Sequence, residues 1–452
     1  MSLRLASPFS GEVFRELELD GPREVERKLA RARAAQRTWA RRSIGERARA
    51  VELALGWVRE HAEEHAREIT LQMGKPIREA RREVATMLER AAWCVANAEA
   101  ALAPEELPAP EGARRRIEHE PLGVVLDLAA WNYPLLTAVN VIVPALLAGN
   151  AVLAKPSART PLCGLAFEQA FASLPDTGLM ACLLVGHEEI EALATARLVD
   201  QVTFTGSLEG GRQVYAAAAR GLIPAAMELG GKDAAYVAED AELARAAAGV
   251  VDGACYNAGQ SCCAVERAYV HEARVDEFLE RAAEVMGAYR LGDPLEEGTT
   301  MGPLATVQGL ERLERQVADA IERGGRLVCG GRRRGAFFEP TLLSGVPQEA
   351  EVMREESFGP VLAVRAVSGD AEALEAMNDS RYGLTASVWT RDEARAERMG
   401  RALRVGTVYR NRCDFVEPSL PWGGVRDSGF GVSLSRFGFL QVTRRKGFLF
   451  QG

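Results

Sequence analysis

The sequence contains no Cys-x-x-Cys pair, although it has eight cysteines among its 452 residues. They lie at positions 94, 163, 182, 255, 262, 263, 329 and 413. Closely paired cysteines are typical of zinc ribbons, and a dense, regular set is typical of small secreted proteins held by disulfides. The scattered pattern argues against both classes. Most of these thiols are expected to be small buried hydrophobic side chains.

Long apolar segments are also missing. The longest apolar stretch, near residues 139–153, is interrupted by Asn140 and Pro144 and is too short to cross a bilayer. The first residues, MSLRLASPFSGEVFREL, lack the apolar core of a signal peptide, so we expect a cytoplasmic protein without a membrane span. A formal net charge of −8 disfavours nucleic acid as a partner.

The length exceeds that of one hydrophobic core, so two or more domains are expected. Residues 22–102 have apolar positions at helical spacing and predict a helical opening. From Gly123 onward, short apolar runs such as GVVLDLAA and QVTFTG alternate with helix-like stretches, which is the pattern of a buried parallel sheet. A second alternating series, with helices expected at 272–289, 306–324 and 391–403, predicts a second α/β domain.

Three segments contain side chains suited to catalysis, but each is ambiguous alone. Cys262 and Cys263 follow small residues in GQSCCAVER, and the alternative is a pair of inert buried thiols. Glu228 stands among apolar residues in MELGG, where burial would raise its pKa and suit a general base, although an ion-paired or exposed glutamate is commoner. Asn132 follows GVVLDLAA and could donate to an oxyanion or close a turn.

Two further patterns suggest ligands. FTGSLEGG lies between a predicted strand and a predicted helix, where backbone amides can bind phosphate. It lacks the G-x-G-x-x-G spacing, so a plain strand–turn–helix connection is the alternative. His61 and His65 match the H-x-x-E-H pattern of some metalloproteases. A charged helix face explains that match better, and no metal is predicted.

Taken in order, several segments resemble those of the aldehyde dehydrogenase superfamily over nearly the whole chain. They are PLGVVLDLAAWNYP, VLAKPSARTP, FTGS with Gly211, MELGGKD, GQSCCA, EESFGPV, YGLTASV and PWGGVRDSG. Glu228 and Cys262 are 34 residues apart, which is the separation of the base and the nucleophile in that family. The resemblance implies an α/β fold with two Rossmann-like three-layer domains and a small β element for bridging and oligomerisation.

The resemblance also implies a role for each catalytic residue. Cys262, the second residue after Gln260, would be the nucleophile, and Cys263 its neighbour. Asn132 and the backbone N–H of Cys262 would bind the oxyanion, and Glu228 would be the general base. The implied reaction is the oxidation of an aldehyde to a carboxylic acid with NAD(P)⁺. It would pass through a Cys262 hemithioacetal and a thioester hydrolysed by water that Glu228 activates.

The nucleotide site implied by the resemblance draws on several segments. Its residues would be Trp131, Lys155, Ser157, Ala158, Gly206, Ser207, Gly211, Leu229, Glu356 and Phe358. Ala158 stands where NAD-preferring relatives often carry a glutamate that binds the ribose hydroxyls. Without that carboxylate, a 2′-phosphate could meet Lys155 and Arg159 without like-charge repulsion. Use of either NAD or NADP is therefore expected.

The substrate pocket implied by the resemblance mixes aromatic with small polar side chains. Its residues would be Tyr133, Thr137, Asn140, Ser261, Cys263, Val416 and Trp422. This set contains no arginine, so it favours a medium-sized aliphatic or aromatic aldehyde over a semialdehyde that carries a carboxylate.

The family architecture implies domain boundaries and self-association. The dinucleotide-binding domain would comprise 1–107 and 122–230, the catalytic domain 231–425, and the bridging element 108–121 and 426–452. The apolar end of the last strand would be an exposed edge in a monomer, so a homodimer or homotetramer is expected.

Two other functions stay open. A CoA-acylating dehydrogenase would share Cys262 and Asn132, although relatives of that type generally lack the glutamate found at position 228. A non-catalytic binding or structural protein of the same fold is the second alternative, because a fold does not guarantee a function. The complete set of matching residues disfavours it.

Overall fold

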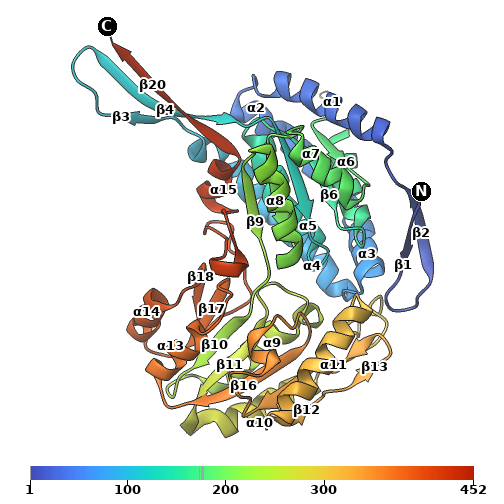
Figure 1. The fold of residues 1–452 in the computed structure, drawn as a ribbon, viewed down its shortest axis with the longest axis vertical. Coiled ribbons are helices and arrows are strands. Elements are labelled where there is room, and N and C mark those ends of the chain that lie inside the picture. The colour runs from blue at the N-terminus through green and yellow to red at the C-terminus, as the bar shows by residue number, and fades with distance from the viewer. Residues whose placement is uncertain (1, 173, 175–177, 452) are drawn as a thin grey trace.

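The computed structural model describes residues 2–172, 174 and 178–451, which form two α/β units and a projecting β arm (Figure 1). Each unit is built on one large sheet, and a three-stranded sheet forms the arm. Within the described residues, no helix combines the length and apolar character needed to cross a membrane. The predicted α/β class with two sheets is confirmed.

The first sheet has the strand order β19-β9-β8-β5-β6-β7. Its strands are β5 (Val124–Ala129), β6 (Ala151–Pro156), β7 (Met180–Cys182), β8 (Gln201–Thr205), β9 (Ala225–Glu228) and β19 (Gly429–Phe430). β19 is antiparallel to β9, and the other neighbours are parallel. All six residues of β5 are buried, as expected for a parallel strand covered on both faces.

Helices on both faces of this sheet make a three-layer unit. They are α1 (Pro22–Trp39), α2 (Ile44–Glu60), α3 (Ala62–Met73), α4 (Ile77–Ala101), α5 (Pro134–Leu147), α6 (Pro161–Ala172), α7 (His187–Thr195), α8 (Leu208–Gly221) and α15 (Ser435–Gln441). Val125 and Val152 pack in one apolar cluster with α2 to α6, whereas Leu126 and Leu153 pack in another with α7 and α8. This division follows the alternation of side chains along a strand.

The second sheet has the strand order β12-β15-β16-β11-β10-β17-β18. Its strands are β10 (Asp233–Val237), β11 (Val265–His271), β12 (Arg326–Cys329), β15 (Thr341–Ser344), β16 (Val361–Val367), β17 (Thr385–Trp389) and β18 (Thr407–Arg410). β12 is antiparallel to β15, and the other neighbours are parallel.

The helices of the second unit are α9 (Leu243–Cys255), α10 (Val275–Gly287), α11 (Val307–Glu322), α12 (Glu351–Arg354), α13 (Asp370–Asn378) and α14 (Glu393–Ala402). The helices predicted at 272–289, 306–324 and 391–403 are confirmed as α10, α11 and α14. Each is slightly shorter at both ends than the sequence pattern, as is usual where helix ends fray.

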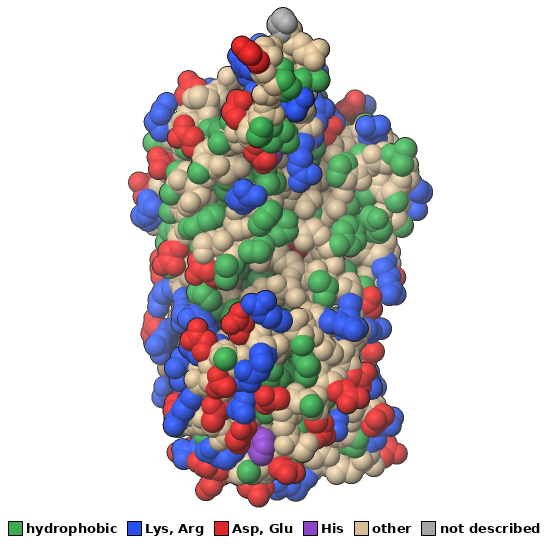
Figure 2. All heavy atoms as spheres, turned by 90° about the vertical axis from the view of Figure 1, so that its left-hand side faces the viewer, with side chains coloured by type: hydrophobic (Ala, Val, Ile, Leu, Met, Phe, Trp, Pro, Cys, Tyr) green, Lys and Arg blue, Asp and Glu red, His purple; other side chains and the backbone are tan. Residues whose placement is uncertain are grey.

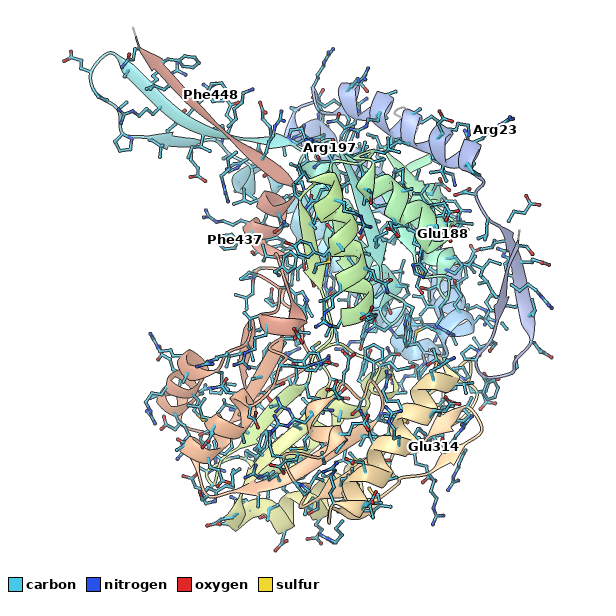
Figure 3. The ribbon with its side chains drawn as sticks, viewed as in Figure 1. Arg23, Glu188, Arg197, Glu314, Phe437 and Phe448 are labelled. Carbon is cyan, nitrogen blue, oxygen red and sulfur yellow. The ribbon has the colours of Figure 1, made fainter. Side chains whose placement is uncertain are left out.

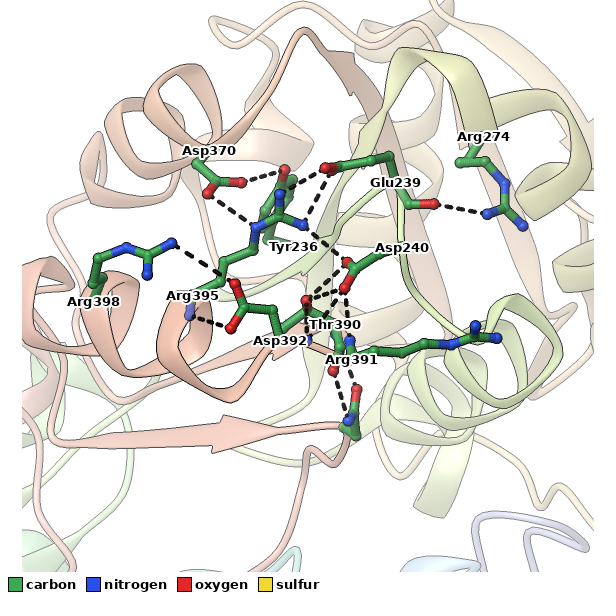
Figure 4. Close-up of polar contacts among 11 residues, drawn as sticks. Tyr236, Glu239, Asp240, Arg274, Asp370, Thr390, Arg391, Asp392, Arg395 and Arg398 are labelled. Carbon is green, nitrogen blue, oxygen red and sulfur yellow. Dashed lines mark hydrogen bonds and ion pairs between the residues drawn. The ribbon is translucent and has the colours of Figure 1, made fainter.

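A network of charged side chains joins the residues that follow the carboxyl ends of β10 and β17 (Figure 4). The Asp240 carboxylate accepts hydrogen bonds from the Thr390 hydroxyl at 2.8 and 2.9 Å. Arg395 of α14 forms ion pairs with Glu239, Asp240 and Asp370. Because these partners come from different elements, the network joins α13 and α14 to the sheet, and its role is structural.

The arm consists of β3 (Glu105–Leu107), β4 (Ala113–Pro121) and β20 (Thr443–Gln451). β20 is antiparallel to β4 along its full length and lies at the edge of this sheet. Two short hairpins complete the described structure: β1 (Ser2–Ala6) with β2 (Val13–Glu18), and β13 (Arg333–Arg334) with β14 (Phe337–Phe338).

Candidate active site

Cys262 lies in a tight loop between the end of α9 and the start of β11. The loop turns sharply because Asn257, Ala258 and Gly259 all have positive φ angles, of 53°, 54° and 69°. Gln260 locks the turn, since its side-chain amide donates to the Asn257 carbonyl at 3.1 Å and its side-chain carbonyl accepts from the Ala305 amide at 2.9 Å. Cys262 is partly exposed, so its sulfur is accessible on a rigid support.

Asn132 packs directly against this loop. Its side-chain Nδ2 donates to the Gln260 carbonyl at 3.1 Å, and the residue is 4% exposed. Its main-chain carbonyl accepts from the side-chain amide of Asn257 at 3.0 Å and from Lys75 Nζ at 2.9 Å. An Asn amide has two N–H bonds, so one remains for a reacting oxygen beside Cys262.

A buried ion pair on the α3–α4 side fixes the Asn132 loop. Lys75 and Glu83 form this pair out of contact with water. Glu83 also accepts a hydrogen bond from the Leu135 backbone at 3.0 Å, and Lys75 Nζ lies 3.8 Å from the centre of the Tyr133 ring. Sequence reasoning missed this support, because charged residues at the start of a helix ordinarily face solvent.

Glu228 is the last residue of β9, where its backbone pairs with Gly429 of β19. Its carboxylate accepts a hydrogen bond from the Ser433 hydroxyl at 2.5 Å. Burial raises the pKa of Glu228 to about 7, against the opposing effect of hydrogen bonds from Ser433 and Trp422. A carboxyl group with this pKa can both take and release a proton near neutral pH, as a general base requires.

A pocket of about 570 Å³ joins Cys262 to Glu228. All seven predicted substrate-pocket residues line it: Tyr133, Thr137, Asn140, Ser261, Cys263, Val416 and Trp422. They come from α5 and the residue just before it, from the Cys262 loop and from the segment after β18. Leu384, Trp422 and Leu434 pack around the two cysteines and give this end of the pocket an apolar wall.

The two adjacent cysteines have different surroundings. The Cys263 thiol and the Ser261 hydroxyl each donate to the Asp414 carboxylate at 2.9 Å. The neighbouring Cys262 side chain and burial both raise the pKa of Cys263 well above its usual value. Cys263 is therefore a protonated hydrogen-bond donor, and Cys262 has the more accessible sulfur. Asp414, whose pKa burial raises to about 6, was not found from the sequence.

Four arginines also line the pocket, and none belongs to the set inferred from the motifs. They are Arg82, Arg90, Arg245 and Arg412. Arg90 is buried, and the other three are exposed. Arg82 and Arg90 lie on α4, far in sequence from every quoted motif, so only the folded chain brings them to the pocket.

The predicted nucleotide residues of the first unit follow the carboxyl ends of its parallel strands. Trp131 comes after β5, and Gly206 and Ser207 come after β8. Lys155 is the last residue but one of β6, and Ser157 and Ala158 follow that strand. Ligands of such sheets bind at this edge.

The N-terminus of α8 lets a ligand and the chain after β9 come close to the helix backbone. The Ser207 hydroxyl caps the helix by accepting the Gly210 amide at 3.2 Å. A Cβ added to Gly211 would lie 2.5 Å from a terminal methyl group of Leu229, so a larger residue here would force the Leu229 side chain to move. The free amides at the helix N-terminus suit phosphate.

The second unit contributes Glu356 and Phe358. The Phe358 ring meets the Trp131 ring edge to face, 5.5 Å between centroids. One oxygen of Glu356 accepts the Gly231 amide at 3.2 Å, and burial raises the pKa of Glu356 to about 7. The other oxygen remains available for a ribose hydroxyl. Together with the α8 terminus, these residues fit a dinucleotide.

Arg159 differs from the expectation that it could meet a 2′-phosphate. Its guanidinium donates to the Ala305 carbonyl and lies over the Trp131 ring, 5.8 Å from the centroid. Lys155 is therefore the side chain that remains to bind a 2′-phosphate. Burial lowers the pKa of its ammonium group.

The histidine pattern at the start of α3 has a structural explanation. His61 Nδ1 donates to the Trp57 carbonyl at 2.8 Å, and its ring stacks on Trp57 with 4.1 Å between centroids. The His65 ring lies beside the same tryptophan. Among the described residues, no group of three or more His, Cys, Asp or Glu side chains could hold a metal ion.

One pocket is lined by Cys262 and the buried Glu228, the Asn132 amide packs against the cysteine loop, and a sheet edge beside them suits a dinucleotide. This combination is typical of an oxidoreductase. Comparison with known proteins specifies the class. The sequence model of the Aldehyde dehydrogenase family matches residues 2–448. The chain belongs to this family, and the prediction of an NAD(P)⁺-dependent enzyme that oxidises aldehydes is confirmed.

The relatives resemble the chain over its whole length. An aldehyde dehydrogenase of Paenarthrobacter nicotinovorans is 37% identical and aligns over 99% of both chains. The NADP⁺ succinate-semialdehyde dehydrogenase of Deinococcus radiodurans is 36% identical over 97% of this chain and 93% of its own. The structure of succinic semialdehyde dehydrogenase from Streptococcus pyogenes with NADP⁺ has a TM-score of 0.95 at 26% identity and covers 100% of both chains. The predicted family fold is therefore confirmed.

Proposed function

We propose that this enzyme oxidises an aldehyde to the free acid with Cys262 as nucleophile, Asn132 as oxyanion donor and Glu228 as general base. The observation that carries the proposal is the single pocket lined by Cys262 and Glu228, against whose cysteine loop the Asn132 amide is fastened. Thiolate, oxyanion donor and base are the three groups that acyl transfer to water requires.

The reaction would begin when the Cys262 thiolate attacks the aldehyde carbon. The resulting oxyanion would be bound by Asn132 Nδ2 and the Cys262 backbone N–H. Bound NAD(P)⁺ supplies the hydride acceptor. The thioester left on Cys262 would then be attacked by water whose proton Glu228 takes, so that the C–S bond breaks and the carboxylic acid leaves.

This proposal differs from a CoA-acylating enzyme in the acceptor of the acyl group, which is water and not CoA. It is supported by the pKa of about 7 of Glu228. In a reaction without CoA, we expect one equivalent of carboxylic acid for each NAD(P)H formed, as measured by chromatography of the product. Turnover that required CoA and gave an acyl-CoA would contradict the proposal, and no turnover on any aldehyde would support a non-catalytic role.

Changing Asn132 to Ala should lower kcat/KM about 10²- to 10³-fold, because one oxyanion donor is lost. Asn132→Asp keeps the shape but places a carboxylate near the oxyanion, so its rate should be lower still. Steady-state kinetics of the two variants, with thermal melting to check folding, measure this effect. A rate within threefold of wild type in Asn132→Ala would show that the backbone N–H suffices.

We also propose that NADP⁺ is a good cofactor for this enzyme. Ala158 leaves the region next to Lys155 without a carboxylate, and Lys155 has no ion-pair partner among the described residues. The 2′-phosphate of NADP⁺ could then bind Lys155 without repulsion from a neighbouring carboxylate. The Deinococcus relative is named for NADP⁺.

The substrate would be an aldehyde that carries a carboxylate, as succinate semialdehyde does. Two of the relatives are named for that compound. The arginines Arg82, Arg90, Arg245 and Arg412 in the pocket support the same class and weigh against the neutral aldehydes that the motif residues alone favoured.

The sheets support the expected division of the chain. We propose the dinucleotide-binding domain at 1–107 and 122–230, the catalytic domain at 231–425, and the bridging element at 108–121 and 426–452. β19 pairs with β9, so part of the last segment also completes the first sheet.

The same arm would join subunits into a homo-oligomer. Phe437, on α15, and Phe448, on β20, lie on one side of the molecule (Figure 3). Hydrophobic side chains gather over the upper part of that face, whereas charged side chains dominate the lower part (Figure 2). Phe437 is 44% and Phe450 52% exposed. An exposed apolar edge of this kind is expected to pair with a second copy.

A further inference from the structure

Arg90 is the one arginine of the pocket that α4 places inside the protein. Glu83, Thr86 and Arg90 follow one another at helical spacing and line the pocket on the same helix face. Arg90 is 6% exposed. The other arginines, Arg82, Arg245 and Arg412, are exposed.

The guanidinium of Arg90 is incompletely satisfied. Its Nη1 donates to the side-chain oxygen of Asn140 at 3.3 Å. Its Nε is buried and has no hydrogen-bond partner within the described part of the chain. A buried cation that lacks a carboxylate is unfavourable, because neither water nor an anion replaces its hydration. We therefore expect a bound ligand to supply the anionic group that pairs with Arg90.

The acids near Arg90 are already committed to other groups. Glu83 pairs with Lys75, and Glu228 accepts the Ser433 hydroxyl. Asp414 accepts hydrogen bonds from the two side chains that flank Cys262 in sequence. The charge of Arg90 lowers the pKa of Glu228, but within the described residues no acid forms a hydrogen bond or ion pair with the guanidinium.

Asn140 fixes the direction of this arginine. Its amide oxygen faces Nη1, and Asn140 itself lies on α5, the helix that follows the Asn132 loop. The side chain is thereby held over the pocket in a defined orientation, with its planar fork available for two parallel hydrogen bonds to a carboxylate.

We propose that Arg90 binds the carboxylate of the substrate and so makes this enzyme selective for short aldehydes that carry an acid at the far end. This inference rests on the proposed function, since it requires the aldehyde end to reach Cys262. The exposed arginines at the pocket lining would add a positive field that attracts the anion.

The test compares one aldehyde acid, 4-oxobutanoate, with its methyl ester, which has the same chain but no charge. Wild type should have a kcat/KM at least about tenfold higher for the acid. Arg90→Met should reduce kcat/KM for the acid about 10- to 100-fold, mainly through KM, and change the ester less than about threefold, since a hydrogen bond to a charged group contributes in this range. Arg90→Lys should restore part of the loss.

Arg78→Met is the matched control, because Arg78 lies on the same helix, is exposed and does not line the pocket. It should leave both substrates within about twofold of wild type. Equal losses on acid and ester in Arg90→Met, or equal use of the two by wild type, would overturn the assignment. The wild-type comparison needs no variant, so misfolding of Arg90→Met cannot obscure the result.

If the proposed reaction itself were wrong, the result would differ from a failure of the Arg90 assignment. Neither compound would then give acid and NAD(P)H in equal amounts, whatever residue stands at position 90.

Discussion

Replacing Glu228 with Gln should give a burst of one NAD(P)H per active site followed by steady-state turnover about 10²- to 10⁴-fold slower than wild type. Glutamine keeps the shape and can still accept the Ser433 hydroxyl, but it cannot take a proton from water. Hydride transfer precedes the step that needs the base, so the enzyme should stop as the thioester. Stopped-flow absorbance at 340 nm and mass spectrometry of the quenched protein would detect both features.

The pH dependence of wild type gives an independent measure of the same group. Burial raises the pKa of Glu228 to about 7, and the base must be deprotonated to act. Thioester hydrolysis should therefore fall about tenfold per pH unit below 7 and level off above it. Glu356, whose pKa is also raised to about 7, serves as the contrast. Glu356→Gln should raise KM for the nucleotide and keep this acid limb. Wild-type steady-state rates in Glu228→Gln would rule out the assigned base.

Replacing Cys262 with Ala should abolish both the burst and turnover, with a loss on the order of 10⁴-fold or more, because no other group can form the covalent intermediate. The oxyanion that Asn132 would bind and the thioester that Glu228 would help to hydrolyse both arise only from the attack by sulfur. The measurement is NAD(P)H formation in single turnover, with circular dichroism to verify the fold.

Cys263→Ala is the paired comparison for that experiment. The Cys263 thiol donates to Asp414, so its loss should alter KM and keep the burst of one NAD(P)H per site. Alkylation followed by peptide mapping should modify Cys262 first. A burst in Cys262→Ala that disappears in Cys263→Ala would reverse the two assignments.

Much of the fold could be predicted because its signals are local. The apolar run of β5 is fully buried and that of β8 mostly so. The amphipathic stretches of α10, α11 and α14 end close to where their patterns end. The proposed catalytic residues could be selected from motif order, since Asn132, Glu228 and Cys262 each belong to a contiguous segment of the sequence.

The charged side chains that surround the proposed catalytic residues could not be predicted. The sequence near a charged residue does not show whether that residue is buried. Lys75, Glu83 and Arg90 occur in a charged region around α4 that has the composition of a solvated surface. Only the packing of α4 against α5 in the folded chain shows that one face of α4 lines the pocket. Asp414 is similarly hidden in a loop, where it meets Cys263 through the tertiary fold alone.

The pairing of Gly429 with Glu228 has a consequence for how the enzyme becomes active during synthesis. The strand that carries the base is flanked on one side by a segment near the end of the chain, and Ser433, which orients the carboxylate, follows four residues later. A nascent chain translated only as far as β18 contains Glu228 and Cys262. It still lacks the strand that pairs with Glu228 and the Ser433 hydroxyl that bonds its carboxylate. The surroundings of Glu228 are thus complete only when the final tenth of the chain has been made, so we expect chains that end at β18 to lack thioester hydrolysis.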